Sequence, residues 1–109
     1  MSSPMSTLSE MNENIREASA LLAEMANPRR LSVLCSLVEG ERSAGELAGL
    51  VALSPSALSQ HLQRLRALDL VATRRDGQTI HYRLASGAVR EILETLHRLY
   101  CGPQSGGRE

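Results

Sequence analysis

Apolar residues recur at helical spacing along most of the chain, and this periodicity predicts five helices. The first is predicted over residues 9–26, where the apolar positions form a narrow seam with spacings of three and four. The seam consists of Met11, Ile15, Ala18, Leu22 and Met25. It suits a peripheral helix on the protein's own core as well as a dimer contact, and we lean towards the dimer contact. Residues 1–8 show no periodicity and are predicted to be a disordered tail.

The second predicted helix opens with a clear start signal. Asn27 is its N-cap and Pro28 takes the first helical position, while Gly40 is predicted to end it. Its apolar face is formed by Leu31, Leu34, Cys35 and Val38, and is widened by Val33 and Leu37. Cys35 is therefore predicted to lie on or beside a buried face.

A third, shorter helix is predicted from a capping box. Ser43 and Glu46 have the required spacing, and the helix continues through Leu47 and Leu50. Residues 51–53 then form a short turn before the fourth helix. Two short helices joined this tightly form a helix-turn-helix, a fairly specific signal that small helical bundles can nevertheless imitate.

The fourth helix, predicted over residues 54–68, has Ser54 as N-cap and Pro55 at its first position. One apolar stripe runs along it, formed by Leu58, Leu62 and Leu65. The opposite face has hydroxyls, amides and a guanidinium but no acid, and consists of Ser56, Ser59, Gln60, Gln63 and Arg64. Such groups can hydrogen-bond to base edges, and Arg is the usual partner of guanine. The pattern predicts a helix that contacts a ligand carrying acceptors and negative charge.

A basic hairpin is predicted directly after this helix. Residues 70–75 and 78–84 alternate between apolar and polar, and Asp76-Gly77 between them is typical of a type I′ turn. A basic hairpin that follows a reading helix is a wing. Arg74 and Arg75 at its tip can reach phosphate or the minor groove.

The ends of the last two helices are also marked. Asp69 stands where Gly would be expected after the fourth helix, and it is predicted to be left-handed. Ser86 caps a fifth helix that ends at Cys101. We therefore predict one DNA-binding and dimerisation domain over residues 9–101 and a second disordered tail over residues 102–109.

Composition limits the class of protein. The chain has 109 residues, enough for one domain with a small core, and no Trp or Phe to fill that core. Small chains of this kind often extend their apolar interior through a dimer interface. No apolar run approaches the roughly 18 residues of a membrane span, and the N-terminus lacks the features of a signal peptide. We expect a cytoplasmic protein without membrane contact, whose two cysteines are thiols.

The formal net charge is zero, which by itself argues against nucleic acid, but the charges are unevenly distributed. Residues 42–90 hold seven Arg against three acids, whereas residues 1–41 hold three Arg against six Glu. Positive charge therefore gathers around the fourth helix and the hairpin after it, where DNA contact is predicted.

Four local stretches carry a family resemblance: Ala-Asn-Pro-Arg-Arg-Leu at 26–31, Gly-Glu-Leu at 45–47, Ser-Ala-Leu-Ser-Gln-His-Leu at 56–62 and Gly-Gln-Thr-Ile-His-Tyr-Arg-Leu at 77–84. With these stretches and this order of elements, the chain resembles the ArsR/SmtB family of bacterial winged-helix repressors over residues 9–101. The resemblance implies a mainly α winged helix-turn-helix fold with five helices and one two-stranded β-hairpin wing. It also implies a homodimer that pairs its first and last helices and leaves its operator DNA when an inducer arrives.

The partner expected from this resemblance is double-stranded operator DNA. The predicted DNA-binding residues are Ser54, Ser56, Ala57, Ser59, Gln60, His61, Gln63, Arg64, Arg74, Arg75, Gln78 and His81. We expect no cofactor and no enzymatic activity. A Cys/His thiol enzyme would need an orienting base and a substrate pocket, and neither is visible in the sequence.

Most members of the family sense metals, but this chain lacks their ligand patterns. Members with a site in the third helix carry Cys-x-Cys there, where this chain has Glu46-Leu-Ala. Members with a site in the last helix open it with Asp-x-His, where this chain has Ser86 and Ala88. Glu94 and His97 lie one turn apart and could ligate a metal weakly. We favour the simpler interpretation, in which they are two solvated side chains. We predict no metal site, and a metal-responsive repressor is the alternative.

Cys35 and Cys101, with the closing segment 96–101, resemble the BigR, SqrR and HlyU branch of the family. The resemblance implies that persulfide or another reactive sulfur species joins the two cysteines by a disulfide or polysulfide bridge, and that bridging releases the operator. We expect Cys35 to react first, because it follows a helix start with Arg29 and Arg30 nearby. The helix dipole disfavours negative charge at Cys101. The alternative is a constitutive DNA-binding protein with inert cysteines.

Overall fold

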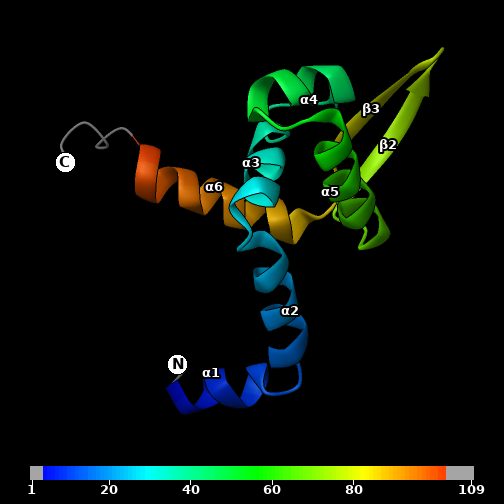
Figure 1. The fold of residues 1–109 in the computed structure, drawn as a ribbon. Coiled ribbons are helices and arrows are strands. Elements are labelled where there is room, and N and C mark those ends of the chain that lie inside the picture. Colours follow the sequence, from blue (N-terminus) through cyan, green and yellow to red (C-terminus); the bar gives the residue numbers. More distant parts are fainter. Residues whose placement is uncertain (1–3, 103–109) are drawn as a thin grey trace. The chain divides into compact units, whose positions relative to one another are not determined.

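The computed structural model describes residues 4–102, and Figure 1 shows its elements. The chain divides into two compact units, Met1–Leu31 and Ser32–Glu109. The boundary falls inside the helix α3 (Pro28–Ser36). The single domain predicted over residues 9–101 stays a prediction, and the tail predicted over residues 102–109 lies outside the described residues except for Gly102.

Two helices form the first unit, where one was predicted. α1 (Pro4–Met11) and α2 (Ile15–Met25) are separated by a turn in which the Asn14 amide donates to the Met11 carbonyl at 2.7 Å. The single helix predicted over residues 9–26 is therefore wrong. Asparagine competes with its own backbone for hydrogen bonds, which explains a break here. α1 also takes in residues 4–8 of the predicted tail, and residues 1–3 lie outside the described residues.

The helix α3 begins as predicted and ends early. The Asn27 side chain accepts hydrogen bonds from the Arg29 and Arg30 amides at 2.9 and 3.1 Å, which confirms it as N-cap. The helix ends at Ser36 rather than just before Gly40. Tighter turns follow until Gly40, whose φ of 154° is open to glycine and strained for other residues.

The second unit contains a three-stranded antiparallel sheet in the order β1–β3–β2. β2 (Val71–Asp76) and β3 (Thr79–Leu84) form the predicted hairpin. A two-residue edge strand, β1 (Arg42–Ser43), pairs with β3 and was missed, because two residues are too few to show an alternating pattern. The described residues thus hold six helices and three strands, rather than five helices and two strands.

The hairpin turn lies one residue later than predicted. Asp76 pairs with Thr79, so the two connecting residues are Gly77 and Gln78. Gly77 has a φ of 66°, whereas Gln78 is not among the described residues with positive φ. This pattern belongs to a type II′ turn, and the predicted type I′ turn is wrong. The register places the buried side chains of Val71 and Leu84 opposite each other, which outweighs the turn preference of Asp-Gly.

Three further helices complete the second unit: α4 (Ala44–Val51), α5 (Pro55–Ala67) and α6 (Gly87–Cys101). The predicted caps are confirmed, since Ser54 and Ser86 each accept a backbone amide at 3.1 Å. The core is aliphatic, and its fully buried side chains are Val33, Leu34, Leu37, Leu47, Leu65, Val71 and Val89. Burying one such side chain contributes about 1.5–3 kcal/mol. None of the described helices is long and apolar enough to cross a membrane.

Candidate DNA-binding surface and thiol site

The side chains of α5 divide between core and solvent as the sequence predicted. Leu58, Leu62 and Leu65 are at most 3 % exposed. On the other side of the helix, Ser54, Ser56, Ser59, Gln60, Gln63 and Arg64 are exposed, while Ala57 and His61 are half-buried. These residues include no acid, so they can offer hydroxyl, amide and guanidinium groups to bases and phosphates.

A left-handed residue links α4 to α5. Ala52 has a φ of 54°, a conformation that destabilises a residue with a Cβ by roughly 1–2 kcal/mol. Two residues later, the Ser54 side chain caps α5 by accepting the Ala57 amide. Together these residues set the point at which α5 leaves the turn, and hence the helix-turn-helix geometry. Ala52 was not predicted, because alanine carries no left-handed signature.

The other end of α5 confirms the prediction for Asp69, whose φ is 60°. The Asp69 amide donates to the Arg66 carbonyl at 3.0 Å, and the Leu70 amide donates to the Leu65 carbonyl at 2.9 Å. These two bonds form a Schellman motif, and both leucines are buried, as its hydrophobic contact requires. The motif ends α5 and turns the chain into β2.

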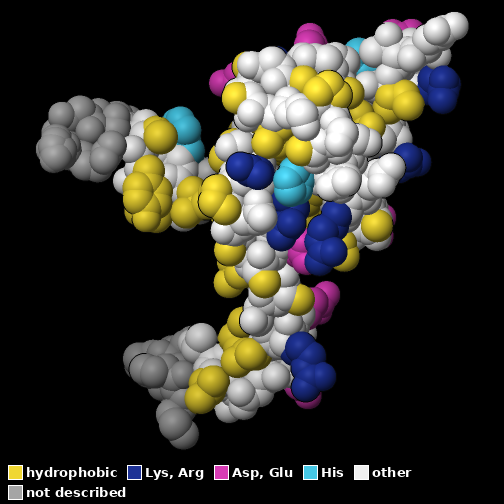
Figure 2. Space-filling view, in the orientation of Figure 1, with side chains coloured by type: hydrophobic (Ala, Val, Ile, Leu, Met, Phe, Trp, Pro, Cys, Tyr) yellow, Lys and Arg dark blue, Asp and Glu magenta, His cyan; other side chains and the backbone are white. Residues whose placement is uncertain are grey.

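Arg74 and Arg75 lie on opposite faces of the hairpin. Arg74 pairs with His81 across the strands and Arg75 pairs with Ile80, and neighbours along a strand alternate between faces. Figure 2 shows arginine side chains, in dark blue, along the hairpin at the upper right. Arg75 and Gln78 are exposed near the turn, whereas His81 is half-buried on the face of Arg74. The four predicted wing residues therefore do not form one contact surface.

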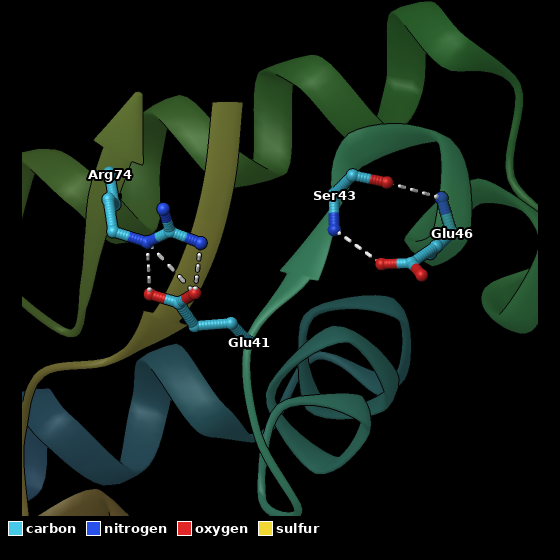
Figure 3. Close-up of polar contacts among 4 residues, drawn as sticks. All are labelled: Glu41, Ser43, Glu46 and Arg74. Carbon is cyan, nitrogen blue, oxygen red and sulfur yellow. Dashed lines mark hydrogen bonds and ion pairs between the residues drawn. The ribbon is translucent and has the colours of Figure 1, made fainter. Parts of the chain in front are cut away.

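Arg74 is bound to a carboxylate that the sequence analysis did not consider (Figure 3). Its Nε donates to Glu41 Oε1 and Oε2 at 3.1 and 3.2 Å, and its Nη2 donates to Oε1 at 2.9 Å. This hydrogen bonding lowers the pKa of Glu41 and raises that of Arg74. The charges of His81 and Arg83 lower the pKa of Glu41 further. The structure thus shows Arg74 paired with a carboxylate, where a phosphate contact was predicted.

Glu41 was missed because its position depends on β1. It lies one residue before that strand, and β1 pairs with β3, which brings the carboxylate within reach of Arg74 on β2. Figure 3 also shows the predicted capping box, in which the Glu46 amide donates to Ser43 Oγ at 3.1 Å and the Ser43 amide donates to Glu46 Oε1 at 2.8 Å. This box starts α4 directly after β1.

Cys35 and Cys101 are both exposed free thiols in the second unit. Cys35 lies in the last turn of α3, and Cys101 is the last residue of α6. The buried residues of α3 are Val33 and Leu34. Cys35 therefore lies beside the buried face and not on it.

A cavity of about 610 Å³ opens next to Cys35. Its lining comes from the end of α3 and the following turn, from β1, from α4 and from α6, and consists of Cys35, Ser36, Val38, Glu39, Arg42, Leu50, Leu93, Glu94, His97 and Arg98. The lining combines a thiol, aliphatic side chains, two arginines and two glutamates. No sequence pattern predicted it, because the four elements meet only in the folded chain.

The electrostatic setting of Cys35 is opposite to the prediction. Protein atoms partly enclose its sulfur, and this burial raises the pKa of the thiol; repulsion from the Cys101 thiolate raises it further. Arg29 and Arg30 were the reason for expecting Cys35 to react first; the raised pKa argues against that reason, and the order of reaction stays a prediction. Arg30 instead binds Glu24, with 2.9 Å to its carbonyl and 3.4 Å to its carboxylate.

Glu94 and His97 both line the cavity beside Cys35. Among residues 4–102, however, no group of three or more His, Cys, Asp or Glu is placed to hold a metal ion. The insensitivity to metals stays a prediction.

Large apolar side chains are exposed on the helices predicted to pair in a dimer. Ile15 and Leu22 on α2 are 43 % and 54 % exposed, and Leu99 and Tyr100 on α6 are 65 % and 62 % exposed. Hydrophobic side chains, in yellow, gather at the end of α6 on the left of Figure 2. An apolar patch exposed on a soluble protein commonly marks an interaction site.

Comparison with known proteins agrees with this geometry. Residues 27–73, from the start of α3 into β2, match the family described as bacterial regulatory protein, arsR family. The chain is 52% identical over 94 residues to the transcriptional activator HlyU of Vibrio cholerae, covering 86% of this chain and 87% of HlyU. The relatives are named as transcriptional regulators rather than as enzymes.

Solved structures of relatives share the fold. Reduced HlyU from Vibrio cholerae matches with a TM-score of 0.80 at 52% identity, over 84% of this chain and 97% of HlyU. The transcriptional repressor BigR from Xylella fastidiosa matches with a TM-score of 0.81 at 35% identity, over 85% of this chain and 95% of BigR. The chain therefore belongs to the arsR family of bacterial regulatory proteins and has the winged helix-turn-helix fold of its HlyU and BigR relatives.

Proposed function

We propose that this regulator represses transcription as a homodimer on operator DNA, and that a disulfide or polysulfide bridge between Cys35 and Cys101 releases it. One observation carries the switch: two thiols distant in sequence are both exposed in the second unit, and one of them lines a cavity. Cysteines that serve only as small hydrophobic packing residues are usually buried. The proposal of repression follows the name of BigR, whereas HlyU is named an activator.

The DNA contacts divide between α5 and the wing. The exposed polar face of α5 lies in the major groove and supplies the base contacts, with Gln60 and Arg64 central to it. Arg75 and Gln78 near the hairpin turn contact the phosphate backbone. Arg74 and His81 take a supporting part, because they lie on the other face of the hairpin and Arg74 is bound to Glu41.

The homodimer uses the exposed apolar faces of the first helices and of α6. Burying Leu22 on α2 and Leu99 on α6 removes apolar surface from water, the usual driving force of association. A two-fold dimer of this kind presents its two reading helices to half-sites separated by about 34–36 Å, one DNA turn. Operator binding then depends on the spacing between the two copies of α5.

The chemistry of the switch is sulfur transfer followed by thiol exchange. The Cys35 thiolate attacks the outer sulfur of a persulfide R–S–SH, the S–S bond of the donor breaks, and the thiolate RS⁻ leaves while Cys35–S–SH forms. The Cys101 thiolate then attacks the Cys35 sulfur and expels HS⁻, which forms the Cys35–S–S–Cys101 disulfide. If Cys35 first receives a second sulfur in the same way, attack on the middle sulfur expels HS⁻ and forms a trisulfide.

Bridging acts on DNA through α6. The start of this helix is already tied to the turn after α3, because Arg90 Nη1 donates to the Val38 carbonyl at 2.9 Å. A bridge at Cys101 ties its other end to α3 and removes the freedom of α6 to adjust within the dimer. A coupling of about 1–3 kcal/mol between bridge and operator lowers DNA affinity by about 5–150-fold.

The cavity, rather than thiolate content, supports Cys35 as the first acceptor. Its raised pKa reduces the fraction of thiolate at neutral pH and so argues against early reaction. The cavity gives a donor molecule a place beside the Cys35 sulfur, and its lining does not include Cys101. Position beside the nucleophile can offset a loss of thiolate.

The test uses full-length wild type, Cys35→Ser and Cys101→Ser on an operator selected from random DNA duplexes. All three reduced proteins are expected to bind, and only wild type is expected to release DNA after treatment with glutathione persulfide. Peptide mass mapping should find Cys35 and Cys101 joined within one subunit, with or without extra sulfur. Treated Cys101→Ser should gain sulfur mass and Cys35→Ser little. Normal release by either single mutant would overturn the switch and leave inert cysteines.

Metal addition separates this proposal from the metal-responsive alternative. Stoichiometric zinc, nickel or arsenite should leave the operator complex of the reduced protein intact, because the described residues contain no ligand cluster. Metal-induced release that persists when both cysteines are replaced by serine would instead implicate Glu94 and His97.

A further inference from the structure

The cavity beside Cys35 is far larger than the transferred sulfur needs. At about 610 Å³ it falls within the 300–1,000 Å³ typical of sites for small organic ligands. A water molecule takes only about 30 Å³ of liquid volume, and hydrosulfide is not much larger. The size therefore fits a whole organic persulfide, with its carbon skeleton, rather than the transferred sulfur alone.

The charged groups of the cavity are balanced. Arg42 and Arg98 supply two guanidinium groups, Glu39 and Glu94 supply two carboxylates, and His97 adds an imidazole. A ligand of one charge sign would meet repulsion from one of these pairs. A zwitterion can place each of its charges against an opposite charge.

Both arginines keep hydrogen-bonding capacity for a ligand. Arg42 Nε donates to the Ser36 carbonyl at 2.9 Å, and its Nη2 lies 3.9 Å from Glu39 Oε1, a long ion pair. Arg98 Nη2 donates to Thr95 Oγ1 at 3.2 Å. A guanidinium has five N–H donors in a planar fork that matches a carboxylate, so each arginine can still bind one.

Aliphatic side chains make up another part of the lining. Val38, Leu50 and Leu93 line the cavity together with Cys35. Leu50 is 56 % exposed and Leu93 is buried, so the apolar surface runs from solvent to the core. Such a surface suits the methylene groups that separate the charges of a small peptide from its sulfur.

We propose that this cavity binds a zwitterionic persulfide derived from an amino acid or short peptide, with a carboxylate on Arg98 or Arg42, an ammonium facing Glu94 or Glu39, and the outer sulfur at Cys35. The inference rests on the proposed sulfur-transfer function and adds to it the recognition of the donor's carbon skeleton. After transfer, the donor leaves as the thiolate RS⁻, and its proton comes from water.

The test compares two donors with the same reacting group. Glutathione persulfide carries two carboxylates and one ammonium, whereas 2-hydroxyethyl persulfide carries neither. Mass spectrometry follows sulfur gain at Cys35 over time in full-length protein. With glutathione persulfide the rate should saturate as donor concentration rises, and with 2-hydroxyethyl persulfide it should rise linearly.

The decisive variant is Arg98→Gln, since Arg98 is exposed and its replacement leaves the core intact. We expect it to slow transfer from glutathione persulfide about fivefold and to leave transfer from 2-hydroxyethyl persulfide unchanged. Arg16→Gln removes the same charge from α2, outside the lining of the cavity, and should change neither rate. An equal loss with both donors, or no loss with either, overturns the recognition site.

Glu94→Gln tests the ammonium contact. It should slow only glutathione persulfide, while Glu91→Gln on the same helix, which does not line this cavity, should have no effect. Faster transfer in Glu94→Gln would overturn the zwitterion and indicate recognition of negative charge alone. If Arg98→Gln affects both donors alike while wild type still forms the bridge and releases DNA, only this inference fails. If wild type does not release operator DNA after treatment with glutathione persulfide, the proposed switch itself is overturned.

Discussion

Two non-glycine residues with positive φ frame α5 at the residue scale. Ala52 precedes it with a φ of 54°, and Asp69 follows it with a φ of 60°. Each holds a conformation that glycine would adopt without a Cβ clash, so each stores a small strain at an end of the reading helix. The fold tolerates both, because capping at Ser54 and the Schellman bonds at Asp69 determine where the helix begins and ends.

Glycine at these positions should relieve the strain while loosening the unfolded chain. We expect Asp69→Gly and Ala52→Gly to change the free energy of unfolding by between zero and about 1 kcal/mol in the stabilising direction. Urea denaturation measures this. Ala67→Gly, two residues before Asp69 and helical, is the control and should destabilise by up to about 1 kcal/mol. Clear destabilisation by Asp69→Gly would mean that its carboxylate stabilises the turn.

The raised pKa of Cys35 predicts a pH dependence at the same scale. A thiol whose pKa is raised carries little thiolate at neutral pH, so alkylation of Cys35 by iodoacetamide should accelerate by about tenfold per pH unit below that pKa. Cys101→Ser removes the repelling thiolate and should lower the pKa of Cys35, which speeds its alkylation at pH 8. The rates follow from mass spectrometry at fixed times. Unchanged alkylation in Cys101→Ser would show that the two thiols do not interact.

At the scale of elements, the proposed DNA contacts divide between α5 and the wing. The exposed face of α5 has amides and a guanidinium, groups able to bind base edges, while the hairpin projects arginines on two faces. Alternation along β2 decides that Arg75 and not Arg74 shares the face of Ile80. The pairing of β1 with β3 decides which acid meets Arg74.

Substitutions in the two elements should separate specificity from affinity. Gln60→Ala should relax discrimination at one base pair by roughly 1–3 kcal/mol. Arg75→Ala should weaken binding to all sequences alike and reduce the salt dependence by about one counterion. Fluorescence anisotropy with matched and mismatched duplexes at several salt concentrations measures both. A change of base preference in Arg75→Ala but not in Gln60→Ala would reverse the assignment.

Glu41 should limit the DNA affinity of the wing by occupying Arg74. Glu41→Gln is expected to tighten binding to all duplexes severalfold and to increase the salt dependence by about one counterion, because Arg74 becomes available to phosphate. Arg74→Ala alone should change little, and in the Glu41→Gln background it should abolish the gain. Glu39→Gln, the same charge change two residues earlier, is the control. A large loss in Arg74→Ala alone would show that phosphate displaces Glu41.

For the whole molecule, the surfaces that matter most for assembly are the exposed apolar ones. The exposed apolar side chains of α2 and α6 lie on elements predicted to pair, and α6 also carries Cys101. In the proposed function, a bridge and a dimer contact on the same helix connect thiol chemistry to the spacing of the two copies of α5. The residue after α6 is restricted to glycine, because a Cβ at Gly102 would lie 2.5 Å from the Arg98 carbonyl oxygen.

A charge on the end of α6 should weaken the dimer. Leu99→Glu is expected to raise the dimer dissociation constant at least about tenfold, because it introduces a carboxylate into apolar surface that the proposed dimer buries. Operator affinity should fall with it, since a monomer contacts one half-site. Leu50→Glu, also on an exposed leucine, is the control and should leave the dimer intact. Sedimentation velocity measures the association, and an unchanged dimer in Leu99→Glu would place the interface elsewhere.

Local interactions determined what could be predicted from the sequence alone. Helix caps at Asn27, Ser43, Ser54 and Ser86, the apolar stripe of α5 and the left-handed Asp69 depend on neighbours within a few residues, so their patterns are visible in the chain. Two of the stretches that carry the family resemblance, 26–31 and 56–62, overlap with this set at Asn27 and at the apolar stripe of α5. Where local preference met tertiary packing, prediction failed: the Val71–Leu84 pairing moved the hairpin turn by one residue.

Only the tertiary structure decided the chemistry of the sites. Glu41 reaches Arg74 through the pairing of β1 with β3, and the cavity assembles from α3, β1, α4 and α6. The pKa of Cys35 rises because folding partly encloses its sulfur and, second, because of repulsion from Cys101, a residue distant in sequence. Burial and the distance between charges are properties of the folded chain, and they set both the direction of a pKa shift and the partner of a charged side chain.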